Sequence, residues 1–283
     1  MRRKFDIFYF VLVIWVLISD FTFAKQNQSE WFPDKCIFPL LEFDLLEVQP
    51  YAGIFYMHSN KINNNAAYIP VNLGFRKAIL GWHWGLTKFD LALGAASYTQ
   101  FEIMRFDQNT LRGGLLNTDF KASGYLNISK NKQRFRLQAF HISSHLGDDY
   151  ILRNQDYEPN DKSVNYEQID FIYLYKLKKT DLYLGFGYVV TPNAFRKRLM
   201  VEGGIQSNIS LKPNLNLSLG SDIKFFEENK FNPDIHAGIG ITMKKNASPQ
   251  LSFLLDLFSG HLPYSTLDLG YIFWIGPSCR LYF

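Results

Sequence analysis

Apolar and polar residues alternate with a period of two along most of this chain. Between residues 214 and 225 the odd positions are mostly apolar, ending at Phe225, and the even positions are polar or small, beginning at Asn214. A period of two places one apolar and one polar face on a β-strand. The pattern therefore predicts strands, which we expect at residues 119–128, 134–145, 167–177, 181–188, 199–208, 214–225 and 235–243.

The connections between the expected strands alternate in length. Long polar connections fall at residues 108–116, 147–167, 191–198, 227–233 and 259–266, and short ones at 129–133, 178–181, 212–214 and 244–248. Long loops at one end and short turns at the other are typical of outer-membrane barrels. With a strand near residues 48–57, the count is about twelve, an even number as bacterial barrels require. The sequence thus predicts an all-β fold, a transmembrane antiparallel β-barrel, with a soluble β-sandwich as the alternative.

The first residues have the three parts of a secretory signal. Basic residues at positions 2–4 precede an apolar run at 7–18, and small residues at Thr22 and Ala24 suit a signal peptidase. We expect a signal peptide at residues 1–24 and export to the bacterial outer membrane. An uncleaved anchor helix is the alternative, although about a dozen apolar residues is short for a span.

The remaining chain divides into an expected N-terminal periplasmic segment, residues 25–47, and a barrel, residues 48–283. Its last strand ends on the aromatic Phe283 and resembles the last strand by which the barrel-insertion machinery recognises outer-membrane proteins. Aromatic side chains on the strands would suit the girdles at the membrane interfaces; the candidates are Trp82, Trp84, Tyr98, Tyr173, Tyr175 and Trp274.

Composition narrows the function classes. Apolar residues make up 47% of the chain and aromatic residues 17%, which is typical of a chain that folds. The formal net charge of only +4 excludes a nucleic-acid binder that depends on phosphate neutralisation. Two cysteines, Cys36 and Cys279, lie near opposite ends and would form either a disulfide or two isolated thiols.

One predicted strand carries residues with catalytic chemistry. In residues 134–145, His141, Ser143 and His145 share the face of Leu137, which in a barrel is directed toward lipid. Ionisable groups at a lipid boundary are costly and suggest a function. Because this strand follows a short turn and runs into a long loop, the cluster would lie at the outer leaflet.

Residues two apart on one face of a strand have Cα atoms about 6.6 Å from each other, so their side chains are within reach of a hydrogen bond. His141 would then deprotonate Ser143 for attack on an ester carbonyl. Glu167, on the returning strand with the same parity, is the preferred residue to orient His141.

Two other interpretations of the cluster stay open. His145, with Asp148 and Asp149 beyond the strand end, could form a metal site, and calcium would suit those carboxylates. Alternatively the Ser and His side chains bond to loop backbone and only organise the loop.

Charged residues with lumen parity suggest what fills the barrel. Arg134, Arg136, Asp170 and Lys176 would form an ionic lining or plug, with a selective pore as the alternative. A basic loop at residues 195–198 would contact lipopolysaccharide phosphates or remain solvated.

The run H-I-S-S-H-L-G-D-D at residues 141–149, with N-T-D at 117–119 and V-N-Y at 164–166, resembles the bacterial family DUF1207 over most of the chain. This resemblance implies a secreted, outer-membrane-type protein and no established activity.

The His141-x-Ser143 pair also resembles the pair in outer-membrane phospholipase A and the lipid A deacylase barrels, which hydrolyse acyl esters. In those families an amide or carboxylate follows the serine by about twelve residues. Here that position is Gln155, which neither family uses. The resemblance implies a serine esterase or phospholipase acting on outer-membrane lipid or lipopolysaccharide, with Glu167 or Gln155 as third residue. The alternative is a non-enzymatic barrel, either structural or a small-solute pore.

Overall fold

The computed structural model describes residues 29–59, 67–105, 111–153, 164–192, 195–244, 250–264 and 269–282. These residues form mostly strands, with no helix long and apolar enough to cross a membrane. The elements are β1 (Ser29–Trp31), β2 (Tyr51–Gly53), β3 (Phe55–Ser59), β4 (Ala67–Trp84), β5 (Thr87–Arg105), β6 (Leu111–Lys130), β7 (Gln133–Leu146), α2 (Asp148–Arg153), β8 (Val164–Leu177), β9 (Thr180–Val189), β10 (Leu199–Lys212), β11 (Leu215–Phe226), η3 (Glu227–Asn229), β12 (Pro233–Met243), β13 (Gln250–Gly260) and β14 (Ile272–Tyr282).

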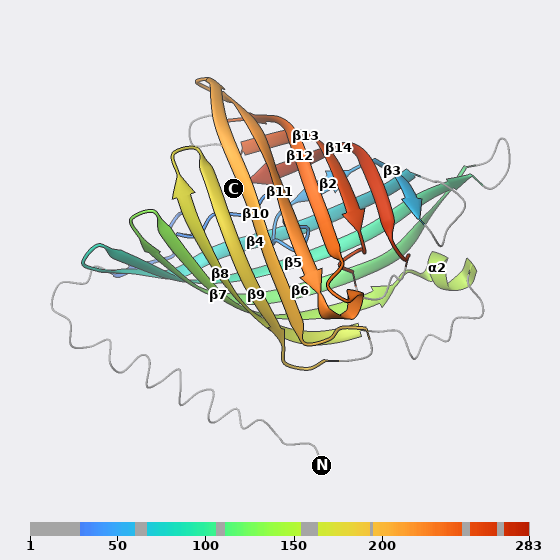
Figure 1. Cartoon of the computed structure of the whole chain (residues 1–283), viewed down its shortest axis with the longest axis horizontal. Helices are drawn as coiled ribbons and strands as arrows, with labels where there is room; N and C mark the ends of the chain where they lie inside the picture. Colours follow the sequence, from blue (N-terminus) through green and yellow to red (C-terminus); the bar gives the residue numbers. More distant parts are fainter. Residues whose placement is uncertain are drawn as a thin grey trace, which may run out of the picture.

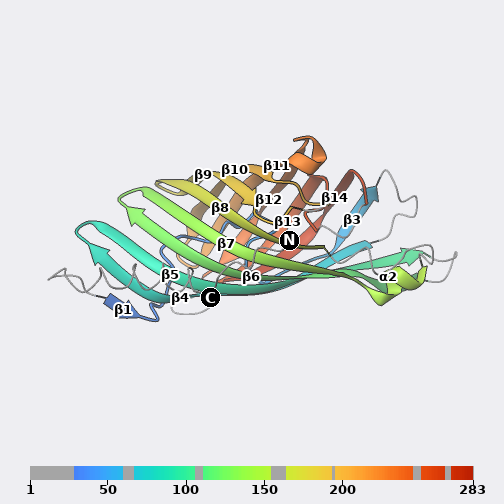
Figure 2. The same cartoon turned by 90° about the horizontal axis from the view of Figure 1, so that it is seen from below.

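The strands form one closed antiparallel sheet (Figures 1 and 2). From β4 to β14 each strand pairs with the next one along the chain. β2 and β3 are two parts of one strand separated at Ile54, and both pair with β14 and with β4. The result is a twelve-stranded barrel, to which β1 adds a short pairing with the end of β4. The predicted fold class and strand number are confirmed.

The two ends of the barrel differ as predicted. Two-residue connections close β4–β5, β6–β7, β8–β9 and β10–β11 at one end, which we call the turn end. At the opposite, loop end, α2 follows β7, and η3 lies between β11 and β12. Several strands extend further than expected: residues 111–116 belong to β6, and β8 begins at Val164. Their ladder pairs, such as Phe101 with Leu115, continue the sheet into the expected loops.

The predicted side-chain faces are also confirmed. In β8 every second residue from Val164 to Ile172 is buried and those between are exposed. Outward-facing Leu184 is 63% exposed, a fraction that suits contact with lipid, whereas Asp222 and Lys224 face inward. The prediction that Tyr98 and Trp274 belong to the interfacial girdles is wrong, because both lie on the inner face and are buried.

The N-terminal segment fills part of the interior. Backbone carbonyls of Phe38 and Leu46 accept hydrogen bonds from Arg76 and Lys121, and that of Phe43 is 2.7 Å from Nδ1 of His236. Residues 36–49 therefore pack against inward-facing side chains of the strands. The sequence predicts a separate periplasmic segment at residues 25–47; the described part from residue 36 onward instead lies within the barrel.

Glu47 is the ionic centre of this packing. Its carboxylate lies 2.7 Å from Nη1 of Arg136 and 3.5 Å from Nη1 of Arg76, and all three side chains are almost completely buried. It also accepts the backbone N–H of Leu41 at 3.1 Å. Of the lumen residues expected to form a lining or plug, Arg136 bonds to this segment, Arg134 bonds to the carbonyl of Ile37, Asp170 is buried and Lys176 is exposed.

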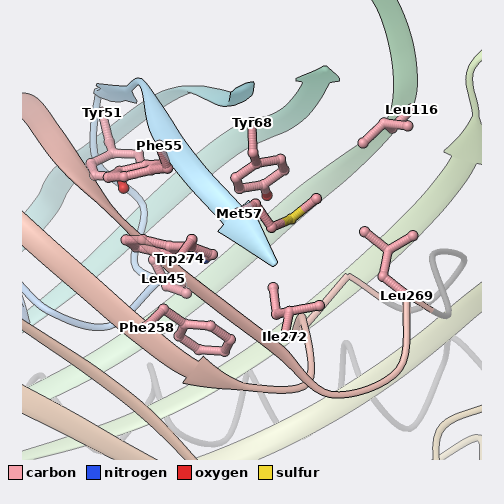
Figure 3. Packing of buried hydrophobic residues seen from close by; sticks show 10 residues of the cluster. All are labelled: Leu45, Tyr51, Phe55, Met57, Tyr68, Leu116, Phe258, Leu269, Ile272 and Trp274. Atoms are coloured by element: carbon pink, nitrogen blue, oxygen red, sulfur yellow. The ribbon is translucent and has the colours of Figure 1, made fainter. Parts of the chain in front are cut away.

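An apolar cluster lies inside the barrel beside the segment (Figure 3). Leu45 from the segment packs with inward-facing aromatic residues, among them Phe55 and Trp274, whose ring centroids are 4.0 Å apart.

Cys36 and Cys279 are free thiols, so the disulfide is not formed.

Replacing Glu47 with alanine should destabilise the barrel strongly. The change leaves two buried guanidinium groups without their counter-charge, and removing one partner of a buried ion pair costs about 3–5 kcal/mol. Urea unfolding of the protein in detergent micelles measures the change in the free energy of unfolding. Glu30→Ala, at an exposed position of β1, is the control and should have almost no effect; equal stability of the two variants would contradict the assigned role.

Candidate functional site

The candidate site lies on the outer face of β7 and β8, near the loop end. His141 and His145 are exposed and Ser143 is half-exposed, while Ile142 and Ser144 between them are buried. This places the three predicted side chains on the outer face, as their parity indicated. The face below them is apolar, with Leu137, Ile169 and Phe171 each between 45% and 48% exposed.

His141 and Glu167 form a hydrogen-bonded pair. The two residues are directly opposite in the β7–β8 ladder, and Nδ1 of His141 lies 2.8 Å from Oε1 of Glu167. Each side chain is about half exposed, at 47% and 48%. With Nδ1 donating to the carboxylate, Nε2 of His141 is left as a potential proton acceptor.

Thr191 completes this arrangement and was not found from the sequence. Its hydroxyl donates to the second carboxylate oxygen of Glu167 and accepts the backbone N–H of Glu167 at 3.0 Å. Thr191 follows β9, which pairs with β8, so only the strand register brings it to Glu167. The hydroxyl fixes the orientation of the carboxylate that in turn orients His141.

Ser143 contacts the other histidine. Its Oγ lies 2.9 Å from Nε2 of His145, and no hydrogen bond to His141 is formed among the described residues. Residues 141 and 145 are equally spaced from Ser143 along the strand, so sequence spacing alone could not choose between them. The rings also differ in their contacts, because His141 is held by Glu167 whereas the centroid of the His145 ring lies 6.0 Å from that of Phe120.

Other residues of the 141–149 run are structural. Ser144 points inward and donates to Asp119, which also accepts from Asn117 at 2.9 Å. Gly147 approaches the backbone so closely that a Cβ atom there would lie 2.2 Å from the carbonyl oxygen of Leu115. These contacts fix the end of β7 against β6.

Among the described residues, the alternative metal ligands His145, Asp148 and Asp149 do not come together around one site. Asp148 and Asp149 begin α2, and the carboxylate of Asp149 accepts the backbone N–H of Leu115 at 2.9 Å. Within the described part of the chain, no three His, Cys, Asp or Glu side chains come close enough to hold a metal ion. Asp149 therefore fastens α2 to β6, and His145 is directed to Ser143. Gln155, the other candidate for the third residue, lies outside the described residues.

A shallow apolar groove continues from the site across β6 and β5 toward β4. In the ladders, Ser143 is opposite Phe120 and His141 is opposite Ala122, which in turn is opposite Ala95. Small side chains between larger ones produce the depression. Its lining side chains are Leu73, Ala95, Ser97, Phe120, Ala122, His141 and Ser143.

The two arginines of the basic loop at residues 195–198 lie in different surroundings. Arg196 is buried, pairs with Glu228 and donates to the carbonyl of Pro263 at 2.7 Å. Arg198 is exposed and donates to the hydroxyl of Tyr188 at 2.6 Å. One arginine thus anchors the loop and the other remains at the outer surface.

A family model described as "Protein of unknown function (DUF1207)" matches residues 59–267. The chain belongs to the DUF1207 family. The resemblance inferred from the sequence is thereby confirmed, and the 141–149 run, Asn117–Asp119 and the V-N-Y run at 164–166 all lie within the match. No curated protein sequence matches this DUF1207 chain significantly.

Two similar solved structures are outer-membrane phospholipases. The enzyme from Salmonella typhi, a dimer with bound calcium, has 9% identity and a TM-score of 0.52, covering 85% of this chain and 94% of that one. Outer membrane phospholipase A from Escherichia coli has 9% identity and a TM-score of 0.52, covering 83% and 98%. At this identity the likeness shows the fold alone: this DUF1207 protein has an outer-membrane β-barrel fold.

Cysteine labelling should distinguish the two faces of β7. In a variant with Cys36 and Cys279 replaced by serine, Ser143→Cys should react with a lipid-soluble maleimide in bilayers. Ser144→Cys should react only after unfolding, because position 144 is completely buried. The extent of labelling, read by mass spectrometry, is the measurement, and equal labelling of both positions in the folded protein would contradict the outward placement of Ser143.

Proposed function

We propose that this protein is an integral outer-membrane lipid acyl-ester hydrolase, exported by its signal peptide, with its loop end at the outer leaflet. The single observation that carries the proposal is the outward-facing hydroxyl of Ser143 on the same strand face as a histidine that a carboxylate orients. His141 and Glu167 supply that pair at 2.8 Å. Nucleophile, base and orienting acid are the three roles that serine hydrolases combine on unrelated folds.

In the proposed reaction, Ser143 Oγ attacks the ester carbonyl carbon while its proton passes to Nε2 of His141. The tetrahedral intermediate collapses, the bond to the alcohol breaks, and His141 returns the proton to the leaving alkoxide. Water then attacks the acyl-Ser143 ester by the same proton route and releases the fatty acid. Glu167 stabilises the imidazolium that forms in each half.

We assign the base to His141 because, among the described residues, it alone of the two flanking histidines has a carboxylate on its second nitrogen. Rotation of the Ser143 side chain about its Cα–Cβ bond would move its hydroxyl from His145 to His141. Both histidines are two residues away on the same strand face, with Cα atoms about 6.6 Å from that of Ser143. In the resting enzyme His145 holds the hydroxyl of Ser143. After the rotation His145 is free to donate a hydrogen bond to the carbonyl oxygen of the substrate ester as negative charge develops there.

The surroundings of the site support a lipid substrate. The groove that begins at His141 and Ser143 is apolar and lies on the outer face of the barrel. An acyl chain lying over Ala95 and Ala122 would bring its ester to Ser143 without leaving the membrane. The fold likeness to two outer-membrane phospholipases is consistent with this substrate class.

The interior does not favour the alternative of a small-solute pore. Conduction needs a water-filled lumen, whereas residues 36–49 pack against the inner faces of several strands. The Glu47 ion pairs and the Leu45 cluster lie within that packing.

Ser143→Ala should abolish the release of fatty acid from phospholipid or lipid A in mixed micelles. Loss of a serine nucleophile lowers kcat by at least about a thousandfold. Titration of free fatty acid measures it. Ser210→Ala is the matched control, because Ser210 is exposed near the turn end of β10, away from the site, and it should retain activity with a barrel that is still heat-modifiable on a gel. Equal activity of wild type and Ser143→Ala would refute the hydrolase.

Glu167→Gln should lower kcat by about 10²–10⁴-fold with little change in KM, because the glutamine no longer stabilises a charged His141. His145→Gln should lower kcat by about 10²–10³-fold, as expected for the loss of one oxyanion donor, and by less than Glu167→Gln does. Steady-state kinetics on a short-chain ester in micelles separates the two variants. A larger loss in His145→Gln than in Glu167→Gln would instead assign the base to His145.

A further inference from the structure

We propose that five lysines at the turn end bind the headgroups of anionic phospholipids in the membrane leaflet at that end. They are Lys130, Lys132, Lys178, Lys179 and Lys212, which we call the lysine patch. All five are exposed. This inference does not depend on whether the chain is an enzyme.

The patch is continuous across three neighbouring hairpins. Lys130 ends β6 and Lys132 lies in the β6–β7 turn. Lys178 and Lys179 form the β8–β9 turn, and Lys212 ends β10. Strands β6 to β11 are consecutive neighbours in the sheet. With about 4.8 Å between strands, adjacent hairpins are about 10 Å apart, so the amines form an arc along one side of the rim.

Carboxylates do not neutralise the patch. The hairpin ends, residues 127–136, 173–183 and 209–218, contain one acidic residue, Asp181, and its carboxylate faces Gln206. Among the described residues no salt bridge involves any of the five lysines. The opposite end of the barrel is mixed in charge, with Glu227 and Glu228 bonded to the backbone of residues 197–199. Among the described residues, the lysine patch therefore has no carboxylate partner, whereas Lys197 and Arg198 at the loop end lie beside Glu227 and Glu228.

The patch begins where the apolar outer surface ends. Leu177 immediately precedes Lys178, and Leu211 immediately precedes Lys212; these leucines are 42% and 53% exposed. Apolar outward-facing side chains mark the depth of the hydrocarbon region. Lysine stems lie along such a surface while their amines reach the headgroup layer. Headgroup phosphates therefore fit the patch by both charge and depth.

The experiment compares two spin-labelled lipids around the full chain in phosphatidylcholine bilayers. Electron paramagnetic resonance gives the association of labelled phosphatidylglycerol relative to labelled phosphatidylcholine at the protein surface. Wild type should prefer phosphatidylglycerol several-fold at low salt, since each lysine near an anionic headgroup contributes about fivefold at most. High salt should reduce the preference.

Replacing all five lysines with glutamine should bring the ratio close to one, and replacing them with arginine should preserve it. A matched variant with glutamine at four exposed loop-end cations, Arg112, Lys197, Arg198 and Lys230, should keep most of the preference. Heat-modifiable migration checks that every variant is folded. An unchanged preference in the five-glutamine variant, an equal loss in the loop-end variant, or no preference in wild type would each overturn the proposal.

Discussion

The closed hydrogen-bonded sheet is the constraint on which everything else in this protein depends. In hydrocarbon every backbone N–H and C=O must be paired within the protein, and a barrel satisfies all of them between strands. Closure leaves each side chain only two directions, outward to lipid or inward to the lumen. The polar cluster at His141 and Ser143 draws attention for this reason, since it lies on the face where its neighbour Leu137 is 46% exposed.

The interior has the opposite problem, because charged side chains directed into a narrow barrel need partners. Strands supply many of them to one another, such as the pairing of Lys224 with Glu202. Arg76 and Arg136 instead take Glu47 from the N-terminal segment, whose carbonyls accept further hydrogen bonds. The segment thus supplies a buried counter-charge to the interior, and its Leu45 packs in the apolar cluster that contains Trp274.

Sequence periodicity was sufficient for the strands and their faces because both follow from the pleat, which is local. The alternation in residues 214–225 gave the correct outward and inward sets of β11. Periodicity could not reveal the path of residues 36–49, since they form no strand and their partners are distant in sequence. Residue type, by contrast, misplaced Tyr98 and Trp274, because an aromatic side chain suits a membrane interface and a packed lumen equally well.

The site shows the same division between local and distant information. Parity brought His141, Ser143 and Glu167 to one face, but register decided the contacts: His141 is opposite Glu167, whereas Ser143 is opposite Asn165. Thr191 reaches Glu167 through a third strand, β9, and no spacing in the sequence indicates that. The choice of Ser143 between two equidistant histidines depends on side-chain rotation, which a sequence pattern does not encode.

The run at residues 141–149 has side chains on both the outer and the inner face of the barrel. Its outward members carry the chemistry, while Ser144 binds Asp119 inside, and Gly147 and Asp149 fasten the strand end to β6. A catalytic arrangement must be held to within a fraction of an ångström, and sites on rigid strands achieve this better than sites on loops. The inward and loop contacts therefore have a functional meaning under the hydrolase proposal: they limit the motion of the strand end that carries Ser143. A purely loop-organising cluster would need those same anchors but would have no use for an exposed His141 oriented by Glu167 and Thr191.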